Sequence, residues 1–206
     1  MDAILRRRGM SKGRPYDAEV EYLESSGTQC IDTGIMPDAD TGISIDFYRL
    51  DDTMSAGALY IFGVTETNKR FYGIYRVIPG ILQWGYHTTV VRDNTNCSIP
   101  FGTKITFKLN YLNNKQAYLS TTDYTWEISS DGDAFEHSIG IFRANNSDTY
   151  PPFRGRIYGF KITQGSEMVM DLIPVRVGQV GYMYDKVSRR LFGNAGTGDF
   201  VIGPDL

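Results

Sequence analysis

Apolar and polar residues alternate along several stretches of the chain. The alternation runs through residues 42–50 (GISIDFYRL) and again through residues 104–112 (KITFKLNYL). A period of two is typical of a strand that buries one face. No window of 11 residues shows a 3.6-residue apolar repeat, so we expect strands and no long helix. The residues predicted to point inward are Ile43, Ile45, Phe47, Ile105, Phe107, Leu109 and Tyr111.

Three short turn sequences divide these strands into hairpins. Pro79-Gly80 separates RFYGIYRV from ILQWGYH, with proline setting φ at the first turn position and glycine accepting a positive φ at the second. Asn113-Asn114 separates residues 104–112 from KQAYLS, and here we expect a positive φ at both asparagines. Gln164-Gly165-Ser166 divides RGRIYGFKIT from EMVMDLIPVRV. Repeated hairpins predict antiparallel sheets.

The predicted fold is all-β, a two-sheet antiparallel β-sandwich, with the jelly roll as the expected form. The chain has 206 residues and is 41% hydrophobic and 22% charged, enough for one domain with its own core. No repeat or linker divides it. We therefore expect a basic N-terminal arm over residues 1–18 and one sandwich over residues 19–206.

The charge of the chain is unevenly distributed. Residues 1–14 contain five basic residues and one acid, a net +4, whereas the whole chain carries −3, so the remainder carries −7. A body this acidic argues against nucleic-acid binding. We expect the arm to anchor the protein to a partner through Ile4, Leu5, Arg6, Arg7 and Arg8, although a solvated terminus would have the same composition.

Targeting and membrane signals are absent from the pattern. The three arginines of the arm are followed by no apolar region of the kind that a secretory signal requires, so we expect no such signal. No apolar run reaches the roughly 18 residues of a membrane-spanning helix. The sequence thus predicts no membrane insertion.

Metal ligands are sparse in the sequence. Cys30 and Cys97 form no Cys-x-x-Cys motif, and we expect two buried free thiols, with a disulfide as the alternative. Calcium is conceivable through Asp131, Asp133 and Glu136, but their spacing is not that of an EF-hand. We expect no cofactor.

Two blocks of sequence carry a resemblance to a known family. Residues 22–37 (YLESSGTQCIDTGIMP) and residues 154–205, which include GRIYGFKI and DLIPVRVGQVGYMYDKVSRRLFGNAGTGDFVIGPD, resemble the concanavalin A-like or laminin-G-like jelly-roll domains of intestinal bacteria and their phages. The resemblance implies a lectin-like sandwich of about a dozen strands, displayed on a cell or virion surface. Cys30 departs from the pattern, because an aromatic residue is commoner there in the family.

The end of the second block has a physical interpretation of its own. Its glycines and asparagines can form consecutive turns, because these residues accept a positive φ. We expect the apolar residues among them to fold back beside the first strand. These residues are Leu191, Phe192, Phe200 and Val201.

An enzymatic alternative follows from the same resemblance. Glucan hydrolases that share the fold carry a Glu-x-Asp-x-x-Glu pattern, and Glu19, Glu21 and Glu24 match its spacing with glutamate at the centre. Two carboxyls about 5 to 5.5 Å apart across a cleft would suit a retaining glycosidase. However, the motif lies on a first, edge-like strand, where charge discourages pairing. With two histidines only, no Ser-His-Asp triad is indicated. We expect no catalysis.

Sugar binding is the stronger functional prediction. Aromatic faces pack on pyranose rings while polar side chains bind the hydroxyls, and two segments offer this chemistry. The alternatives are that the aromatic hairpin belongs to the core and that the loop has ordinary turn chemistry. The candidate residues are Tyr72, Tyr75, Gln83, Trp84, Tyr86 and His87 in the hairpin, where Trp84 and Tyr86 share a face, and Arg143, Asn145, Asn146, Asp148 and Tyr150 in the loop.

Together these observations predict a non-enzymatic interaction module of a phage particle. The arm would dock on a capsid, tail or fibre protein, and the sandwich would contact surface glycans from the virion surface. The alternative is a bacterial cell-surface lectin or a degraded glucanase. A homo-oligomer is expected because virion proteins repeat with the symmetry of the particle.

Overall fold

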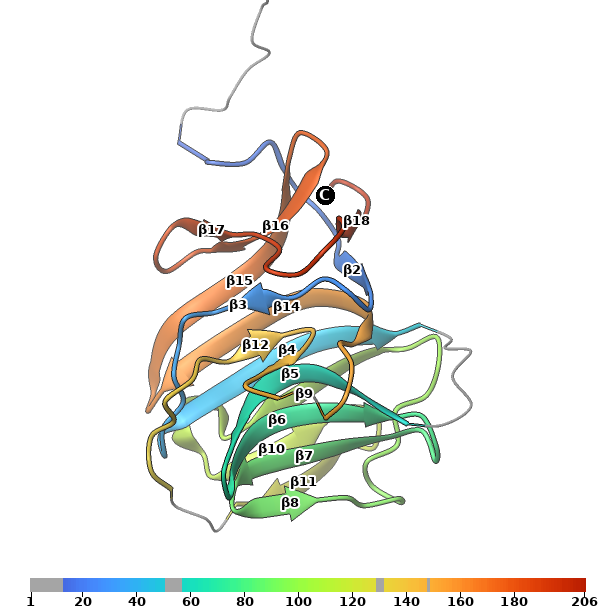
Figure 1. Ribbon diagram of the computed structural model, residues 1–206, viewed down its shortest axis with the longest axis vertical. Helices are drawn as coiled ribbons and strands as arrows, with labels where there is room; N and C mark the ends of the chain where they lie inside the picture. The colour runs from blue at the N-terminus through green and yellow to red at the C-terminus, as the bar shows by residue number, and fades with distance from the viewer. Residues whose placement is uncertain (1–12, 51–56, 129–131, 148) are drawn as a thin grey trace, which may run out of the picture.

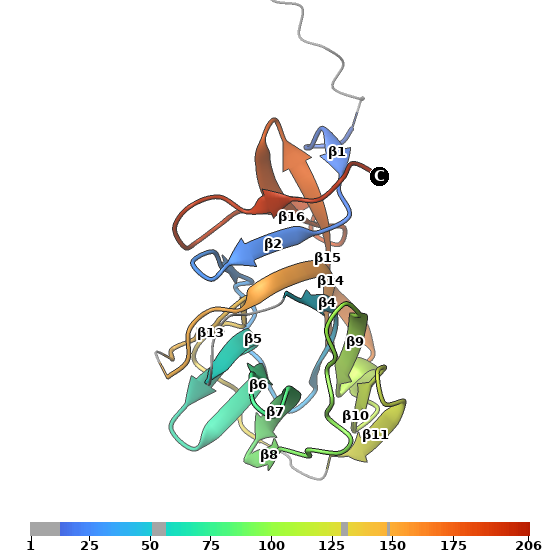
Figure 2. The ribbon, with the colours of Figure 1, turned by 90° about the vertical axis from the view of Figure 1, so that its right-hand side faces the viewer.

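The strands form two sheets that pack face to face. The computed structural model describes residues 13–50, 57–128, 132–147 and 149–206. Figure 2 shows β5–β7 on one side of the sandwich and β9–β11 on the other. The expected two-sheet sandwich is therefore confirmed. The predicted anchoring residues Ile4, Leu5, Arg6, Arg7 and Arg8 lie outside the described residues.

The larger sheet has eleven strands. Its main path runs β11-β10-β9-β4-β14-β15-β16-β17, with β1 beside β15, and with β2 between β14 and β18. Figure 1 shows this sheet continuing beyond the smaller one toward β16–β18. The strands are β1 (Ala18–Glu19), β2 (Leu23–Ser26), β4 (Thr41–Arg49), β9 (Lys104–Leu109), β10 (Gln116–Leu119), β11 (Tyr124–Glu127), β14 (Arg154–Gln164), β15 (Glu167–Val177), β16 (Val180–Asp185), β17 (Arg190–Phe192) and β18 (Val201–Ile202).

The smaller sheet has seven strands in the order β3-β12-β5-β6-β7-β8, with β13 also beside β5. The β13–β5 ladder is parallel, whereas the other ladders among the described residues are antiparallel. The strands are β3 (Ile31–Asp32), β5 (Ala58–Glu66), β6 (Lys69–Arg76), β7 (Ile81–His87), β8 (Thr89–Val91), β12 (Gly140–Ile141) and β13 (Ala144–Asn145). The expected dozen strands is an underestimate, because several two-residue strands form only by long-range pairing.

Side chains from both sheets meet in one core. The ring of Phe62 in β5 lies 6.3 Å from Phe107 in β9 and 5.9 Å from Phe160 in β14. Gly73 in β6 makes room for this ring, since a Cβ there would lie 2.4 Å from Phe62. The inward residues predicted for β4 and β9 are buried, but Tyr111 is only partly buried because β9 ends at Leu109 and a 3-10 turn, Tyr111–Asn113, follows.

The positive φ angles predicted for the turns are present at both glycines and at Asn113 but not at Asn114. Gly80 has φ +85° and Gly165 has φ +59°, as their hairpins require. Asn113 has φ +54°, but Asn114 has φ −80°. The expectation of two positive values is wrong, because the link between β9 and β10 is longer than a two-residue turn and instead places Leu112 and Lys115 in the left-handed region.

The C-terminal tail returns to the start of the domain. β18 pairs with β2, and the N–H of Leu206 donates to the carbonyl of Glu19. The expected return of Val201 beside the first strands is thereby confirmed. Leu191 and Phe192 instead belong to β17, which pairs with β16. Tyr16, from the predicted arm, is buried, and the centroid of its ring lies 4.9 Å from that of Tyr184.

Candidate functional site

The two faces of the β6–β7 hairpin differ in chemistry. Because neighbouring side chains on a strand point to opposite faces, Tyr75, Trp84 and Tyr86 enter the core, whereas Tyr72 and Gln83 lie on the outer face of the smaller sheet. The predicted hairpin residues therefore do not act together.

The inward residues cannot form a stacking surface for a sugar. Trp84 and Tyr86 are 0% exposed, and Tyr75 and His87 are each 1% exposed. Trp84 packs 6.0 Å from the ring of Trp126. Trp84 and Tyr86 do share a face, but it is the core face. For Tyr75, Trp84 and Tyr86 the ligand-binding expectation is wrong, because the period of the strands directs them between the sheets.

A hollow of about 310 Å³ lies on the outer face, and we call it the tyrosine hollow. Its lining residues come from β5, β6, β7 and the segment that follows β13. Figure 2 shows β13 beside β5. Tyr72, Gln83 and Tyr150, predicted from two separate segments, meet here. The lining residues are Tyr60, Thr65, Glu66, Arg70, Tyr72, Ile74, Gln83, Thr149 and Tyr150.

The aromatic walls of the hollow are packed against each other. The ring of Tyr60 lies 5.4 Å from that of Tyr150 and 6.0 Å from that of Tyr72. Gly85 lies next to this group, and a Cβ there would be 3.1 Å from the Tyr72 ring. The rings are thus held by the sheet before any ligand arrives, which reduces the entropy lost on binding.

A chain of hydrogen bonds fixes the polar groups of the hollow. Gln83 Nε2 donates to the Tyr72 hydroxyl at 3.0 Å, and Gln83 Oε1 accepts from Arg76 Nε at 2.6 Å. Arg76 also donates to the Tyr150 hydroxyl at 3.3 Å. Gln83 therefore cannot rotate without breaking one of these bonds, and its amide is oriented by the sheet.

The two inner phenols remain protonated. Burial raises the pKa of both Tyr60 and Tyr72 above the ordinary tyrosine value, and the hydrogen bonds that they make with Ser147 and Gln83 act in the opposite direction without cancelling it. A neutral phenol both donates and accepts hydrogen bonds. Each hydroxyl already has one protein partner, Ser147 for Tyr60 and Gln83 for Tyr72, and retains further hydrogen-bonding capacity.

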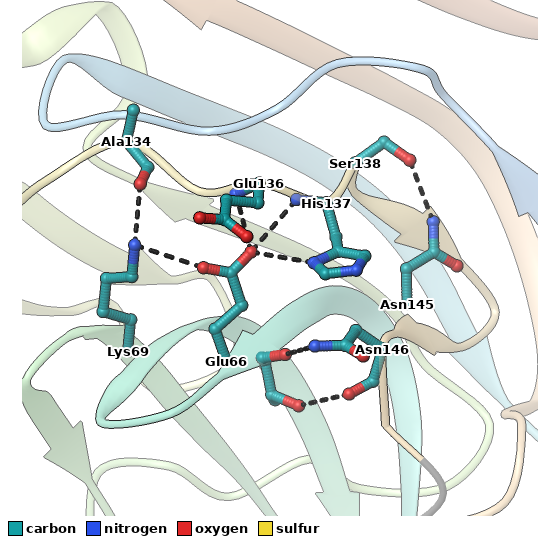
Figure 3. Close-up of polar contacts among 9 residues, drawn as sticks. Glu66, Lys69, Ala134, Glu136, His137, Ser138, Asn145 and Asn146 are labelled. Atoms are coloured by element: carbon teal, nitrogen blue, oxygen red, sulfur yellow. Dashed lines mark hydrogen bonds and ion pairs between the residues drawn. The ribbon is translucent and has the colours of Figure 1, made fainter.

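Glu66, at the end of β5, joins the tyrosine hollow to a second hollow of about 300 Å³. We call the latter the glutamate hollow, lined by Glu66, Thr67, Lys69, Glu136, His137 and Asn146. Figure 3 shows the Glu66 carboxylate at its centre. One oxygen accepts from the backbone N–H groups of Glu136 and His137 at 2.7 and 3.0 Å and from His137 Nδ1 at 3.0 Å, while Lys69 Nζ lies 3.1 Å from the other.

These contacts keep Glu66 ionised. Burial by itself would raise the pKa of Glu66, but the hydrogen bonds from His137, from the Glu136 N–H and from Lys69 outweigh it and lower the pKa below the ordinary value. The carboxylate side chain is 10% exposed. Glu66 therefore anchors residues 134–137 to the β5–β6 hairpin and is already occupied by protein donors.

The predicted loop residues are distributed along the segment beside β5. Asn146 lines the glutamate hollow and donates to the Thr65 carbonyl at 3.1 Å. Asn145 donates to Ser138 Oγ at 3.1 Å and also contacts Asp32. Arg143 instead lies 3.9 Å from Cys30 Sγ. Asp148 lies outside the described residues. Asn145 and Arg143 thus hold the loop to β3 and its flanking residues.

The two cysteines form no disulfide with each other. Cys30 and Cys97 are free and buried, as expected. Burial raises the pKa of the Cys97 thiol to about 11. Of the calcium candidates, Asp133 and Glu136 are exposed and Asp131 lies outside the described residues. Within the described ranges, no group of three or more His, Cys, Asp or Glu side chains could hold a metal ion.

The three glutamates of the enzymatic alternative do not all converge. Glu19 and Glu21 line a hollow of about 300 Å³ with Lys104 and Tyr158. The Glu19 carboxylate accepts from Tyr16 at 2.9 Å and lies 3.3 Å from Arg14. Glu24 is instead paired with Arg156 at 2.7 Å. Among the described residues, two glutamate side chains line this hollow, and Tyr158 is its one aromatic ring.

A larger hollow of about 460 Å³ lies between the residues after β3 and β15–β17. Its acids already have structural partners. Asp185 accepts from the N–H groups of Asp171, Val187 and Ser188, and Asp32 accepts from Gly34, Ser138 and Asn145. Phe192 is its one aromatic lining residue among those described. The tyrosine hollow therefore fits sugar chemistry better.

Several residues of the tyrosine hollow were not predicted from the sequence. Tyr60, Glu66 and Arg70 lie on the outer face of β5 and β6 or at their shared end. Arg70, Tyr72, Ile74 and Arg76 follow a period of two, which was a detectable signal. Tyr60 was missed because the β5 segment, ALYIFGVTE, is apolar on both faces and shows no alternation.

The described strands thus form a two-sheet, predominantly antiparallel β-sandwich. The chain is similar to a solved structure described as that of a "putative carbohydrate binding protein" from Bacteroides ovatus, with TM-score 0.58 and 11% sequence identity over 92% of this chain. The chain spans 61% of the length of that protein. No protein-family model and no curated protein matches the sequence. At this identity the likeness establishes the fold alone.

Among the described residues, no helix has the length and apolar character needed to span a bilayer.

Proposed function

We propose that this protein is a carbohydrate-binding module whose site is the tyrosine hollow. One observation carries the proposal: the Tyr60, Tyr72 and Tyr150 rings meet the fixed amide of Gln83 in one hollow of about 310 Å³. This volume lies at the lower end of the range for small-molecule sites. The description of the Bacteroides ovatus neighbour as a carbohydrate-binding protein supports the same class.

The chemistry of the hollow matches that of a sugar residue. Tyr150, the most accessible of the three rings, can pack on the apolar face of a pyranose. Gln83, Thr65 and Thr149 supply neutral donors and acceptors for hydroxyl groups. No nucleophile or general acid is needed for this activity, so we propose a non-enzymatic function.

Replacement of the accessible ring tests the proposal. Tyr150→Ala should weaken binding to the preferred glycan on an array at least tenfold, about 1.4 kcal/mol, while leaving the fold intact. Tyr124→Ala is a matched control, because Tyr124 is an exposed tyrosine of β11 on the opposite sheet. Equal binding by wild type and Tyr150→Ala would contradict the proposal.

A second candidate function is hydrolysis at Glu19 and Glu21, which line one hollow. A retaining glycosidase would release reducing ends from a β-glucan, and Glu21→Gln would abolish the release. We expect no release by wild-type protein. Turnover that depends on Glu21 would replace the binding proposal with an enzymatic one.

The finer proposal is that residues 1–18 anchor the module to a protein of a phage particle, with a bacterial surface as the alternative location. The support is the net charge of +4 in residues 1–14 against −7 in the remainder. Deletion of residues 1–14 should leave the sandwich folded, because the buried core begins at Tyr16, and should abolish incorporation into the particle. Incorporation of the truncated protein at the wild-type level would refute the anchor.

A further inference from the structure

Two arginines in and beside the tyrosine hollow have no acidic partner among the described residues. Arg70 lines the hollow, and neither a hydrogen bond nor an ion pair satisfies its guanidinium there. Arg76 donates to Gln83 and to the Tyr150 hydroxyl, both neutral groups. Their positions at β6 residues 70 and 76 place both side chains on the outer face with Tyr72.

The acid of the hollow does not balance these charges. Glu66 is held by Lys69 and by three N–H donors of Glu136 and His137. Lys69 further donates to the Ala134 carbonyl at 2.7 Å, as Figure 3 shows, so the pair is fixed on the side of the glutamate hollow. With Glu66 neutralised by Lys69, the uncompensated charge that the described residues give the tyrosine hollow is positive.

A guanidinium that is partly buried without a partner carries a desolvation cost that a bound anion would remove. Arginine matches planar carboxylates and tetrahedral oxyanions with paired N–H donors. The Tyr60 and Tyr72 hydroxyls lie close enough to Arg70 for its charge to act on their pKa, in the direction opposite to burial. Arg70, Tyr60 and Tyr72 line the same hollow, so an anion at Arg70 would lie near both phenols.

We propose that the tyrosine hollow selects acidic glycans, in which a carboxylate or sulfate of the sugar binds Arg70 while the ring packs on Tyr150. This inference rests on the proposed function and adds the class of ligand. Gln83 and Arg76 would then hold the neighbouring hydroxyls, since both are already fixed to the tyrosines.

The test uses an array that carries uronate-bearing, sulfated and neutral oligosaccharides of matched length, followed by calorimetric titration of the best ligand. Wild type should bind an acidic oligosaccharide at least tenfold more tightly than its neutral counterpart. Arg70→Gln should lose this preference, and Arg70→Lys should retain part of it. Arg189→Gln, in the exposed β16–β17 turn, removes one positive charge away from the hollow and should leave the preference for acidic oligosaccharides unchanged.

The outcomes separate this inference from the proposed function. Preference for the uronate identifies a carboxylate ligand, and preference for the sulfated sugar identifies a sulfate; both support the inference. Binding of neutral oligosaccharides with equal affinity, lost in Tyr150→Ala, would overturn the acidic selectivity and retain the sugar site. Binding of none of the three classes would contradict both.

Discussion

At the scale of single residues, adjacent positions in β7 have opposite roles. Trp84 is fully buried against Trp126, whereas Gln83 faces the tyrosine hollow. Trp84→Ala should lower the free energy of unfolding by about 3–5 kcal/mol, because it leaves a cavity in the core. Gln83→Ala should cost less stability and weaken glycan binding. Urea denaturation and array binding of the two variants would measure this contrast, and a small stability loss in Trp84→Ala would contradict the core assignment.

Glu66 predicts a dependence of stability on pH. The pKa of Glu66 is lowered in the folded state. Its charge therefore stabilises the fold fully at pH values above the unfolded pKa, which is about 4.3. This stabilisation is lost as the pH falls through the folded pKa, which is lower. Glu66→Gln should lower the free energy of unfolding at pH 7 by about 1.5–3 kcal/mol, the value of hydrogen bonds to a charged group.

The stability difference between wild type and Glu66→Gln should shrink as the pH falls through the folded pKa of Glu66. Urea titrations from pH 7 down to pH 3 would measure it. A difference that stays constant over this range would show that the carboxylate charge is not the stabilising feature.

At the scale of elements, the C-terminal tail supports the segment that carries the site. Phe200, just before β18, lies 5.2 Å from the ring of Phe142, and Phe142 directly precedes the segment that runs to Tyr150. Phe200→Ala should lower the free energy of unfolding by about 3–5 kcal/mol and speed amide exchange at residues 143–147. Unchanged exchange there would contradict this support.

The elements also show how far the sequence was informative. Alternation predicted β4 and β9, and glycine turns predicted the hairpins at Gly80 and Gly165. The two-residue strands β12 and β13 could not be predicted, because their pairing with β5 joins segments about 80 residues apart. The site was only partly predicted: Tyr72, Gln83 and Tyr150 were named, but the face on which each lies depends on the register of β6 and β7.

At the scale of the whole molecule, the two sheets share one core. Phe62 contacts aromatic rings of the other sheet in both β9 and β14. The protein should therefore unfold in a single transition, seen at the same urea concentration by far-ultraviolet and near-ultraviolet circular dichroism. Two separated transitions would show that the sheets are stabilised independently.

The sequence has a basic arm and an acidic remainder, and Arg70 adds positive charge to the tyrosine hollow. Their functional meaning depends on whether the outer face of the smaller sheet is the binding surface. The alternative surface is the hollow at Glu19 and Glu21, which lies on the other sheet beside the C-terminus.

Mapping of backbone NMR shifts during titration with the best glycan from the array distinguishes these surfaces most directly. We expect shifts confined to Arg70, Gln83, Thr149, Tyr150 and their strand neighbours. Shifts centred on Glu19, Glu21 and Tyr158 would contradict it.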